Sequence, residues 1–212
     1  MKLAGKTIKE GDFITLDVPY YDAPAIYIGK GVLTKPTPED SGLLELLEII
    51  QKHIKDFDVH ANADQPKDAV LARMFKAPGI GLCRTEHMFF AENRINRFRS
   101  MILAENTEER TALLKELKKD QVDDFYQIFK IMAGFPVTIR LLDAPLHEFL
   151  PHTKGGMADF LKYMQKKNKK LTTQELSARC DLLREVNPML GHRGVRIAVS
   201  YPEIYNIQVK AI

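Results

Sequence analysis

Two arginines in this sequence each stand at the end of an apolar run, where a guanidinium could bind an anion. Arg84 follows residues 79–83 and precedes Thr85, and Arg140 ends the run that begins at Pro136. A guanidinium presents a rigid fork of donors that matches two oxygens of a carboxylate or phosphate. The repeated pattern predicts a site for a small phosphorylated or carboxylated anion. For a lone arginine, the alternative is a surface residue in an ion pair.

The segment 187–196 contains two further cations, Arg193 and Arg196, among apolar and turn-forming residues. Either could join the anion site, and the alternative is a loop held by salt bridges. His147 and Glu148 could form a metal pair, but neighbours on an extended segment point in opposite directions. The lysines between residues 162 and 170 are typical of a solvated helix end. Cys83, within the first apolar run, is interpreted as a buried structural thiol.

The elements that must position the arginines alternate between strands and helices. We expect strands at 57–64, 79–84 and 136–142, because each is a short apolar segment. Between them, Pro66 begins a short helix, and a long helical stretch covers 91–133 with a break near 106–107. This order predicts a parallel sheet, in which the carboxyl ends of adjacent strands lie about 4.8 Å apart and could present both arginines to one ligand.

The remaining segments are predicted from local signals. Residues 13–17 alternate apolar and polar side chains, which is typical of a half-buried strand, and residues 25–31 form a second strand. A proline-rich linker at 36–40 precedes an amphipathic helix at 43–54. A short helix is expected near 157–164. Capping boxes at 172–175 and 200–203 predict helices that run to about residue 183 and to residue 212.

The composition is that of an ordinary globular protein. The chain has 212 residues, of which 45% are hydrophobic and 28% charged, with a formal net charge of +3. So small a surplus gives no case for a nucleic-acid or membrane partner. Two cysteines are too few for a disulfide framework, so a reducing compartment is expected. The chain has no apolar run of membrane-span length and no signal-peptide core at its start.

Three segments, 79–90, 137–151 and 187–196, closely resemble the pyruvate, phosphate dikinase family of phosphoenolpyruvate-utilising enzymes. The run Asn62-Ala63-Asp64 and the run Tyr201-Pro202-Glu203-Ile204-Tyr205 fit the same family. Phosphoenolpyruvate synthase and enzyme I of bacterial sugar uptake are more distantly similar. The His-Glu-Phe-Leu-Pro run at 147–151 favours the dikinases over these two relatives.

The resemblance implies an α/β fold and a division of the chain into three parts. Residues 57–212 would form about the first three β/α units of a partial (β/α)8, TIM-type, phosphoenolpyruvate/pyruvate-binding barrel. Residues 1–34 would be the C-terminal, β-rich end of a swivelling phosphohistidine domain, and 35–56 a linker helix. By the same resemblance, Arg84 and Arg140 bind substrate, and Arg193 is a supporting cation.

The family's activity interconverts ATP, phosphate and pyruvate with AMP, diphosphate and phosphoenolpyruvate through a phosphohistidine. The resemblance implies Mg²⁺ as cofactor, with its ligands outside this segment. It implies phosphoenolpyruvate or pyruvate, the rest of a dikinase chain and a second copy of the parent as partners. It also implies a cytoplasmic, or for some parents a plastid or glycosomal, location.

Parts of the family pattern are missing from this sequence. No histidine has the context of the family's phosphorylated histidine, and the nucleotide-binding domain is absent. The later barrel strands, with the Mg²⁺ carboxylates and the proton-donating cysteine, are absent too. We therefore expect no turnover by the chain alone, and association or a flexible fold because three of eight strands leave an unpaired edge. The alternatives are a non-catalytic binding or interaction module, or a segment of phosphoenolpyruvate synthase or enzyme I.

Overall fold

The computed structural model describes residues 2–3, 5–19, 22–33, 37–54, 56–167 and 171–212. The chain divides into two compact units, residues 1–53 and 54–212, which are considered separately. Two of the lysines in the predicted charge run, Lys169 and Lys170, lie outside the described residues. Within the described residues, no helix is both long and apolar enough to cross a membrane.

The first unit contains two short antiparallel sheets and a helix. Strands β1 (Lys2–Leu3) and β2 (Lys6–Thr7) pair with each other, as do β3 (Ile14–Asp17) and β4 (Ala25–Ile28). A 3₁₀ turn, η1 (Glu39–Ser41), precedes α1 (Leu43–His53). The strands predicted near 13–17 and 25–31 and the helix predicted at 43–54 are therefore present.

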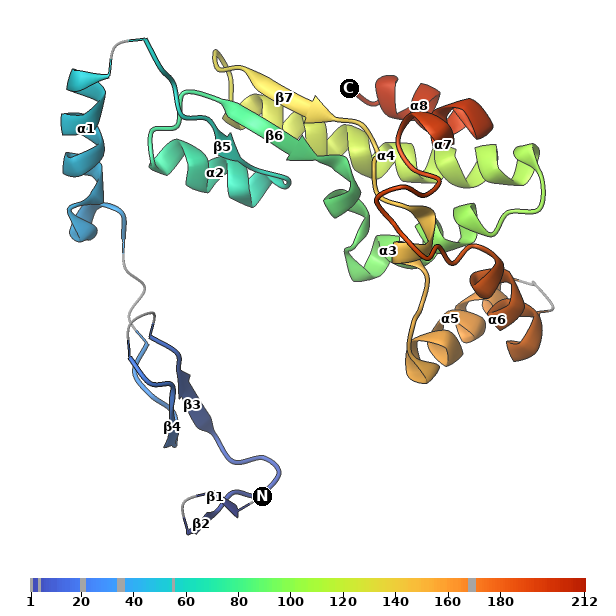
Figure 1. Cartoon of the computed structure of the whole chain (residues 1–212), viewed down its shortest axis with the longest axis horizontal. Coiled ribbons are helices and arrows are strands. Elements are labelled where there is room, and N and C mark those ends of the chain that lie inside the picture. The colour runs from blue at the N-terminus through green and yellow to red at the C-terminus, as the bar shows by residue number, and fades with distance from the viewer. Residues whose placement is uncertain (1, 4, 20–21, 34–36, 55, 168–170) are drawn as a thin grey trace. The chain divides into compact units, whose positions relative to one another are not determined.

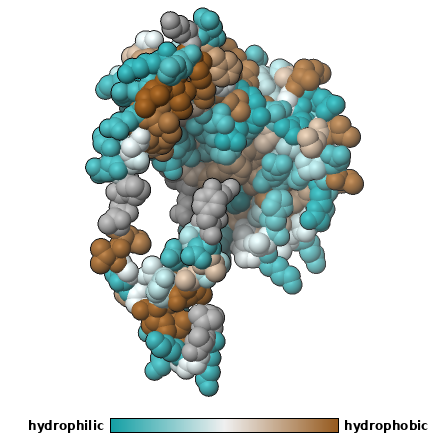
Figure 2. All heavy atoms as spheres, turned by 60° about the vertical axis from the view of Figure 1, so that its left-hand side comes forward, coloured by the Kyte–Doolittle hydropathy of each residue, from teal (hydrophilic) through white to brown (hydrophobic). Residues whose placement is uncertain are grey.

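The apolar side chains of this first unit are not buried within it. Leu16 is 63% exposed and Phe13 66%, so the prediction that this strand is half-buried is wrong for the unit by itself. A two-stranded sheet has no second layer to cover its apolar face, which explains the exposure. Figure 2 shows hydrophobic surface on this unit. None of its described Val, Ile, Leu, Phe or Tyr side chains is buried.

The second unit is built around a three-stranded parallel sheet. Its order is β5 (Ala61–Asn62), β6 (Ile80–Arg84), β7 (Val137–Arg140). Helix α2 (Pro66–Met74) connects β5 to β6, and helices α3 (Glu92–Ile102) and α4 (Thr107–Ile131) connect β6 to β7 (Figure 1). The predicted alternation of strands and helices and the parallel sheet are confirmed.

The boundaries of these helices follow from local chemistry. Pro66 occupies the first turn of α2, and Gln65 and Asp68 form a capping box there. At the predicted break, the Asn106 side-chain oxygen accepts a hydrogen bond of 2.8 Å from the amide of Glu109, so α4 begins with a satisfied N-terminus. A Cβ at Gly79 would lie 2.9 Å from Pro136 and from His60, so only glycine lets these segments approach at the start of β6.

The first strand of the sheet is shorter than the predicted 57–64. Only Ala61 and Asn62 pair with β6, whereas Phe57 and Val59 are each 71% exposed. β5 is an edge strand, and of the residues before it His60 packs against Gly79 and Gly81, whereas Phe57 and Val59 face solvent. The apolar pattern of 57–60 therefore predicted strand residues that do not pair with the sheet.

The remaining elements lie after β6 and β7. They are η2 (Thr85–Phe89), η3 (Leu146–Phe149), α5 (Lys154–Lys166), α6 (Thr173–Leu182), α7 (Val195–Ser200) and α8 (Pro202–Val209). The capping box at Thr172 and Glu175 is confirmed, and α5 is longer than the expected 157–164. The helix predicted from residue 200 to 212 is shorter in the structure, where α8 covers Pro202–Val209. Ser200 ends α7 instead of capping α8, and its hydroxyl lies 3.0 Å from Nε2 of His192.

Two apolar clusters hold the second unit together. One packs the sheet against α4 and includes Ile80, Phe125 and Ile128, all 1% exposed or less. Full burial of such a side chain stabilises the fold by roughly 1.5–3 kcal/mol. The other joins α3, α4, η3 and α5–α8. Cys83 is fully buried in the first cluster, where burial, with nearby carboxylates, raises the pKa of its thiol to about 12. Its predicted structural role is consistent with this position.

Candidate anion site at the strand ends

Arg84 and Arg140 lie at the same edge of the sheet. They are register partners in the parallel pair of β6 and β7, the last residue of each strand. The side chain of each is 36% exposed. The register places two solvent-accessible guanidinium groups at the carboxyl ends of neighbouring strands, as the sequence pattern predicts.

Arg84 is oriented by a buried carboxylate. Asp64, which follows β5, accepts a 2.7 Å bond from Nη2 of Arg84 and another 2.7 Å bond from its backbone amide. Burial alone would raise the pKa of Asp64, but the hydrogen bonds and charge of Arg84 hold it below its usual 3.8. The carboxylate is therefore ionised at neutral pH and fixes the fork of Arg84. Nη1 has no hydrogen bond to any described residue.

Arg140 and Arg193 share the carboxylate of Asp143. Arg140 contacts Glu86, which is 5% exposed, through Nη2, and its Nη1 lies 3.5 Å from Asp143. Nη2 of Arg193 is 2.8 Å from the same Asp143 carboxylate. The Nε of Arg140 is buried and has no partner among the described residues. Arg193 thus joins the cluster through Asp143, while Arg196 is directed elsewhere, to the carbonyl of Gly191.

A buried glutamine joins the two strand ends. Gln208 on α8 donates to Oγ1 of Thr85 at 2.9 Å and accepts from the amide of Leu142 at 2.8 Å. Thr85 in turn donates to the carbonyl of Arg140 at 3.0 Å. Gln208, Thr85 and Leu142 are all buried, so water cannot easily replace a lost partner. The network fixes the segments that follow the two arginines.

Tyr205 and Gly194 position the loop that carries Arg193. The Tyr205 hydroxyl contacts the carbonyls of Leu142 and Gly194 at 2.5 and 2.8 Å. Gly194 has φ of +53°, and a Cβ there would meet the Asp143 carboxylate at 2.8 Å. The position therefore requires glycine for both its conformation and its space. Burial raises the pKa of Tyr205 to about 12, so its hydroxyl stays protonated at neutral pH.

The cluster is balanced in charge. Three guanidinium groups face three carboxylates, those of Asp64, Glu86 and Asp143. Its ability to bind an anion would come from the directions of its remaining donors, not from a surplus of positive charge. The carboxylates were not singled out from the sequence as site residues. Glu86 stands two positions after Arg84, and Asp143 three after Arg140, but spacing alone does not say which carboxylate pairs with which arginine.

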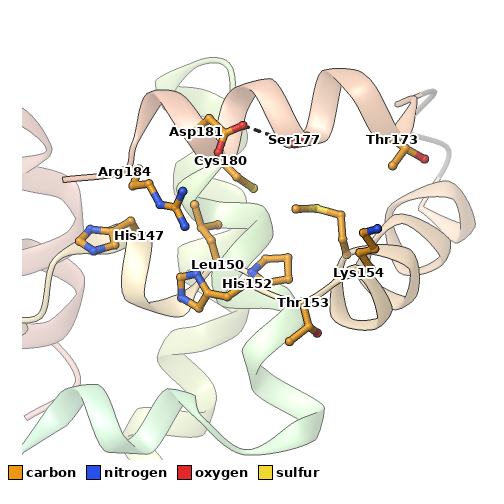
Figure 3. Close-up of a pocket in the computed structure, with 12 residues that line it drawn as sticks. His147, Leu150, His152, Thr153, Lys154, Thr173, Ser177, Cys180, Asp181 and Arg184 are labelled. Carbon is orange, nitrogen blue, oxygen red and sulfur yellow. Dashed lines mark hydrogen bonds between the residues drawn. The ribbon is translucent and has the colours of Figure 1, made fainter. Parts of the chain in front are cut away.

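Two other sequence candidates are His147 and Glu148. Glu148 lies near the cluster, because its charge, after the hydrogen bond from Arg193 to Asp143, helps to raise the pKa of Arg193. His147 and Glu148 do not form a metal pair with a third ligand, because no described group of three His, Cys, Asp or Glu side chains is placed to hold a metal ion. His147 lines a pocket of about 480 Å³ between α5 and α6 (Figure 3). None of the three clustered arginines lines this pocket.

The fold and the cluster define an α/β protein with oriented cationic side chains at the carboxyl ends of parallel strands. The sequence pattern of the PEP-binding domain of PEP-utilising enzymes, where PEP denotes phosphoenolpyruvate, matches residues 39–212. The chain belongs to this family.

Three pyruvate, phosphate dikinases are similar to this chain over nearly its whole length. The chain is 59% identical over 209 residues to the pyruvate, phosphate dikinase of Treponema pallidum, 46% over 209 residues to that of Rhizobium meliloti and 43% over 211 residues to that of Clostridium symbiosum. These matches cover 98%, 99% and 100% of this chain. The chain spans only 22–23% of the length of those relatives.

Proposed function

We propose that this chain is a segment of a pyruvate, phosphate dikinase and supplies the arginines that bind phosphoenolpyruvate or pyruvate. The observation that carries the proposal is the register pairing of Arg84 and Arg140, each with a carboxylate that orients its fork. Identity to dikinases over nearly the whole chain supports it. The parallel sheet of β5, β6 and β7 would be the start of a (β/α)8 barrel, and the first unit the end of a phosphohistidine domain.

The arginines would act by charge stabilisation and positioning. Nη1 of Arg84 and the unpartnered Nε of Arg140 could donate hydrogen bonds to a carboxylate or phosphoryl oxygen. Charge-assisted hydrogen bonds of this kind contribute about 1.5–3 kcal/mol each. Because Asp64 and Glu86 already fix the guanidinium planes, little side-chain entropy would be lost on binding. Arg193, through Asp143, would support Arg140 and the charge around the substrate.

The family implies Mg²⁺, but the described residues do not fit a site for it. They contain no group of three potential ligands, and the carboxylates beside the arginines are already paired with guanidinium groups. We therefore assign this chain no step that involves the ion. Its proposed contribution is substrate binding, within a parent that acts in the cytoplasm or an organelle and pairs with a second copy.

Binding and turnover of the purified chain test this proposal separately. Phosphoenolpyruvate should bind in a calorimetric titration, and Arg84→Gln and Arg140→Gln should each weaken binding at least about tenfold. Arg179→Gln is the matched control, since Arg179 is 37% exposed and also pairs with a carboxylate, Glu105. Unchanged affinity in both test variants would refute the arginine site.

The alternative function is a non-catalytic binding or interaction module. A coupled assay with ATP, phosphate and pyruvate separates activity from binding, and we expect no phosphoenolpyruvate formation by this chain. Turnover would show that the isolated chain is an enzyme by itself and would contradict this part of the proposal.

A further inference from the structure

A pocket between α5 and α6 has the features of a second ligand site. It has a volume of about 480 Å³, within the roughly 300–1,000 Å³ of typical small-molecule sites. One wall comes from residues 147–157 and the other from one face of α6 and the turn after it. It shares no lining residue with the arginine cluster at the strand ends.

Cationic and imidazole side chains gather in this pocket. The Arg184 and His152 side chains approach each other in Figure 3, with His147 on the same side of the view, and Lys154 lies on the opposite side, at the start of α5. Asp181 is the one carboxylate among the described residues of the lining, and it accepts a hydrogen bond of 3.4 Å from the hydroxyl of Ser177. With both histidines neutral, the lining still carries more positive than negative charge.

These cations differ from the clustered arginines in their lack of partners. Within the described part of the chain, neither Arg184 nor Lys154 forms an ion pair, whereas Arg84, Arg140 and Arg193 each do. The Nδ1 atom of His147 is also shielded from solvent without a hydrogen-bond partner in those residues. A buried polar atom without a partner is costly in free energy.

The pocket also has an apolar part, beside the hydroxyl groups of Thr153, Thr173 and Ser177. Leu150, which is 2% exposed, forms part of the wall together with Met157 and the thiol of Cys180. A bare phosphate ion would fill the cationic end and leave this part empty. The complementary ligand therefore has an apolar body as well as an anionic group.

We propose that this pocket binds a small organic anion, with one phosphate or carboxylate group toward Arg184 and His147 and an apolar body against Leu150 and Met157. The ligand is distinct from the substrate at the strand ends. Charge-assisted hydrogen bonds would hold the anionic group, and burial of the body would add affinity without a large charge surplus.

Alkylation of Cys180 offers a direct test in the intact chain. Of the two cysteines, Cys83 is fully buried, while Cys180 is partly exposed and lines the pocket. We would measure the rate of reaction with iodoacetamide at Cys180 by peptide mass spectrometry. The probes are phenyl phosphate and benzoate, which carry the two possible anionic groups on the same ring, and neutral benzyl alcohol.

Saturable protection of Cys180 by phenyl phosphate or benzoate, with half-protection on the order of 1 mM, is the expected result. The more protective of the two identifies the preferred anionic group. Arg184→Gln should raise the half-protecting concentration at least about tenfold, and Lys154→Gln is a second, independent variant. Arg179→Gln, on the same helical segment but outside the pocket lining, and Arg84→Gln, at the strand-end site, should leave protection unchanged.

Three results would overturn the proposal. The first is no protection by either anion up to about 20 mM, a concentration far above that expected for a specific site. The second is equal protection by benzyl alcohol, which would define a purely apolar cavity. The third is unchanged protection in both Arg184→Gln and Lys154→Gln.

Discussion

Arg84 and Arg140 are register partners across two parallel strands, and each guanidinium is held by a different buried carboxylate. The spacing of the two cations is set by backbone pairing, whereas their directions are set by Asp64 and Glu86. A substitution at Asp64 can therefore change the direction of Arg84 without changing the strand pairing that sets its spacing from Arg140.

Asp64→Asn should weaken phosphoenolpyruvate binding about fivefold, although it removes a negative charge next to Arg84. If charge alone controlled affinity, the change would strengthen binding. If orientation controls it, loss of the charge-assisted pair frees the fork and raises the entropy cost of binding. Calorimetric titration of the variant checks the sign, with Glu105→Gln as a control because Glu105 pairs with a distant arginine. Tighter binding would show that orientation by Asp64 is unimportant.

Gln208→Ala should lower the free energy of unfolding by about 1–3 kcal/mol. The change leaves the hydroxyl of Thr85 without its donor and the amide of Leu142 without its acceptor, in a part of the fold shielded from water. Urea denaturation followed by circular dichroism measures the effect. Asn206→Ala, at an exposed position of the same helix, serves as the control and should change the midpoint little.

Gly194→Ala should disturb the site more than an ordinary loop substitution. The added methyl would lie 2.8 Å from the Asp143 carboxylate, at a φ of +53° that side chains rarely adopt. We expect a loss of about 1–3 kcal/mol in stability and weaker phosphoenolpyruvate binding, because Asp143 links Arg140 and Arg193. Gly155→Ala, where an added Cβ meets nothing within 4 Å, is the matched control. Wild-type behaviour of Gly194→Ala would contradict this account of the loop.

The contribution of Tyr205 to the free energy of unfolding should fall as pH rises into the alkaline range. Its pKa is about 12 in the fold against an ordinary 10.0, so unfolded chains lose this proton first as pH rises. The contribution is therefore complete below pH 10 and is lost between about pH 10 and 12. Tyr205→Phe should cost about 1 kcal/mol at pH 8 and progressively less as pH rises through that window.

The difference between wild type and Tyr205→Phe isolates this residue, because Cys83 also titrates at alkaline pH and does so in both proteins. Urea unfolding at pH 8, 10 and 11.5 provides the measurement. A constant difference across these values would show that the hydroxyl does not lose its proton preferentially on unfolding.

Local signals in the sequence predicted most of the scaffold. The apolar runs that end in Arg84 and Arg140 are strands, and Asn106 marks the helix break, because these features depend on neighbouring residues. Helix α7 was missed, since it begins after Gly194 with no side-chain cap to signal it. The serine at its end looked like a cap in sequence but contacts His192 in the fold.

The supporting residues of the site could not be predicted in the same way. Gln208 and Thr85 are 123 positions apart, so no local pattern relates them. Which carboxylate meets which arginine depends on the strand register, and burial of Asp64 and Glu86 depends on packing of the whole unit. The sequence indicates which groups could bind an anion, while tertiary structure decides how they are directed.

The bridge from Gln208 to Thr85 also bears on how the protein forms during synthesis. Both strands that carry the arginines leave the ribosome well before α8 does. The nascent chain can pair β6 with β7 at that stage, but the segments beyond them remain unanchored until residue 208 emerges and completes the bonds to Thr85 and Leu142. The arginine site would thus be completed only after the sheet that carries it has paired.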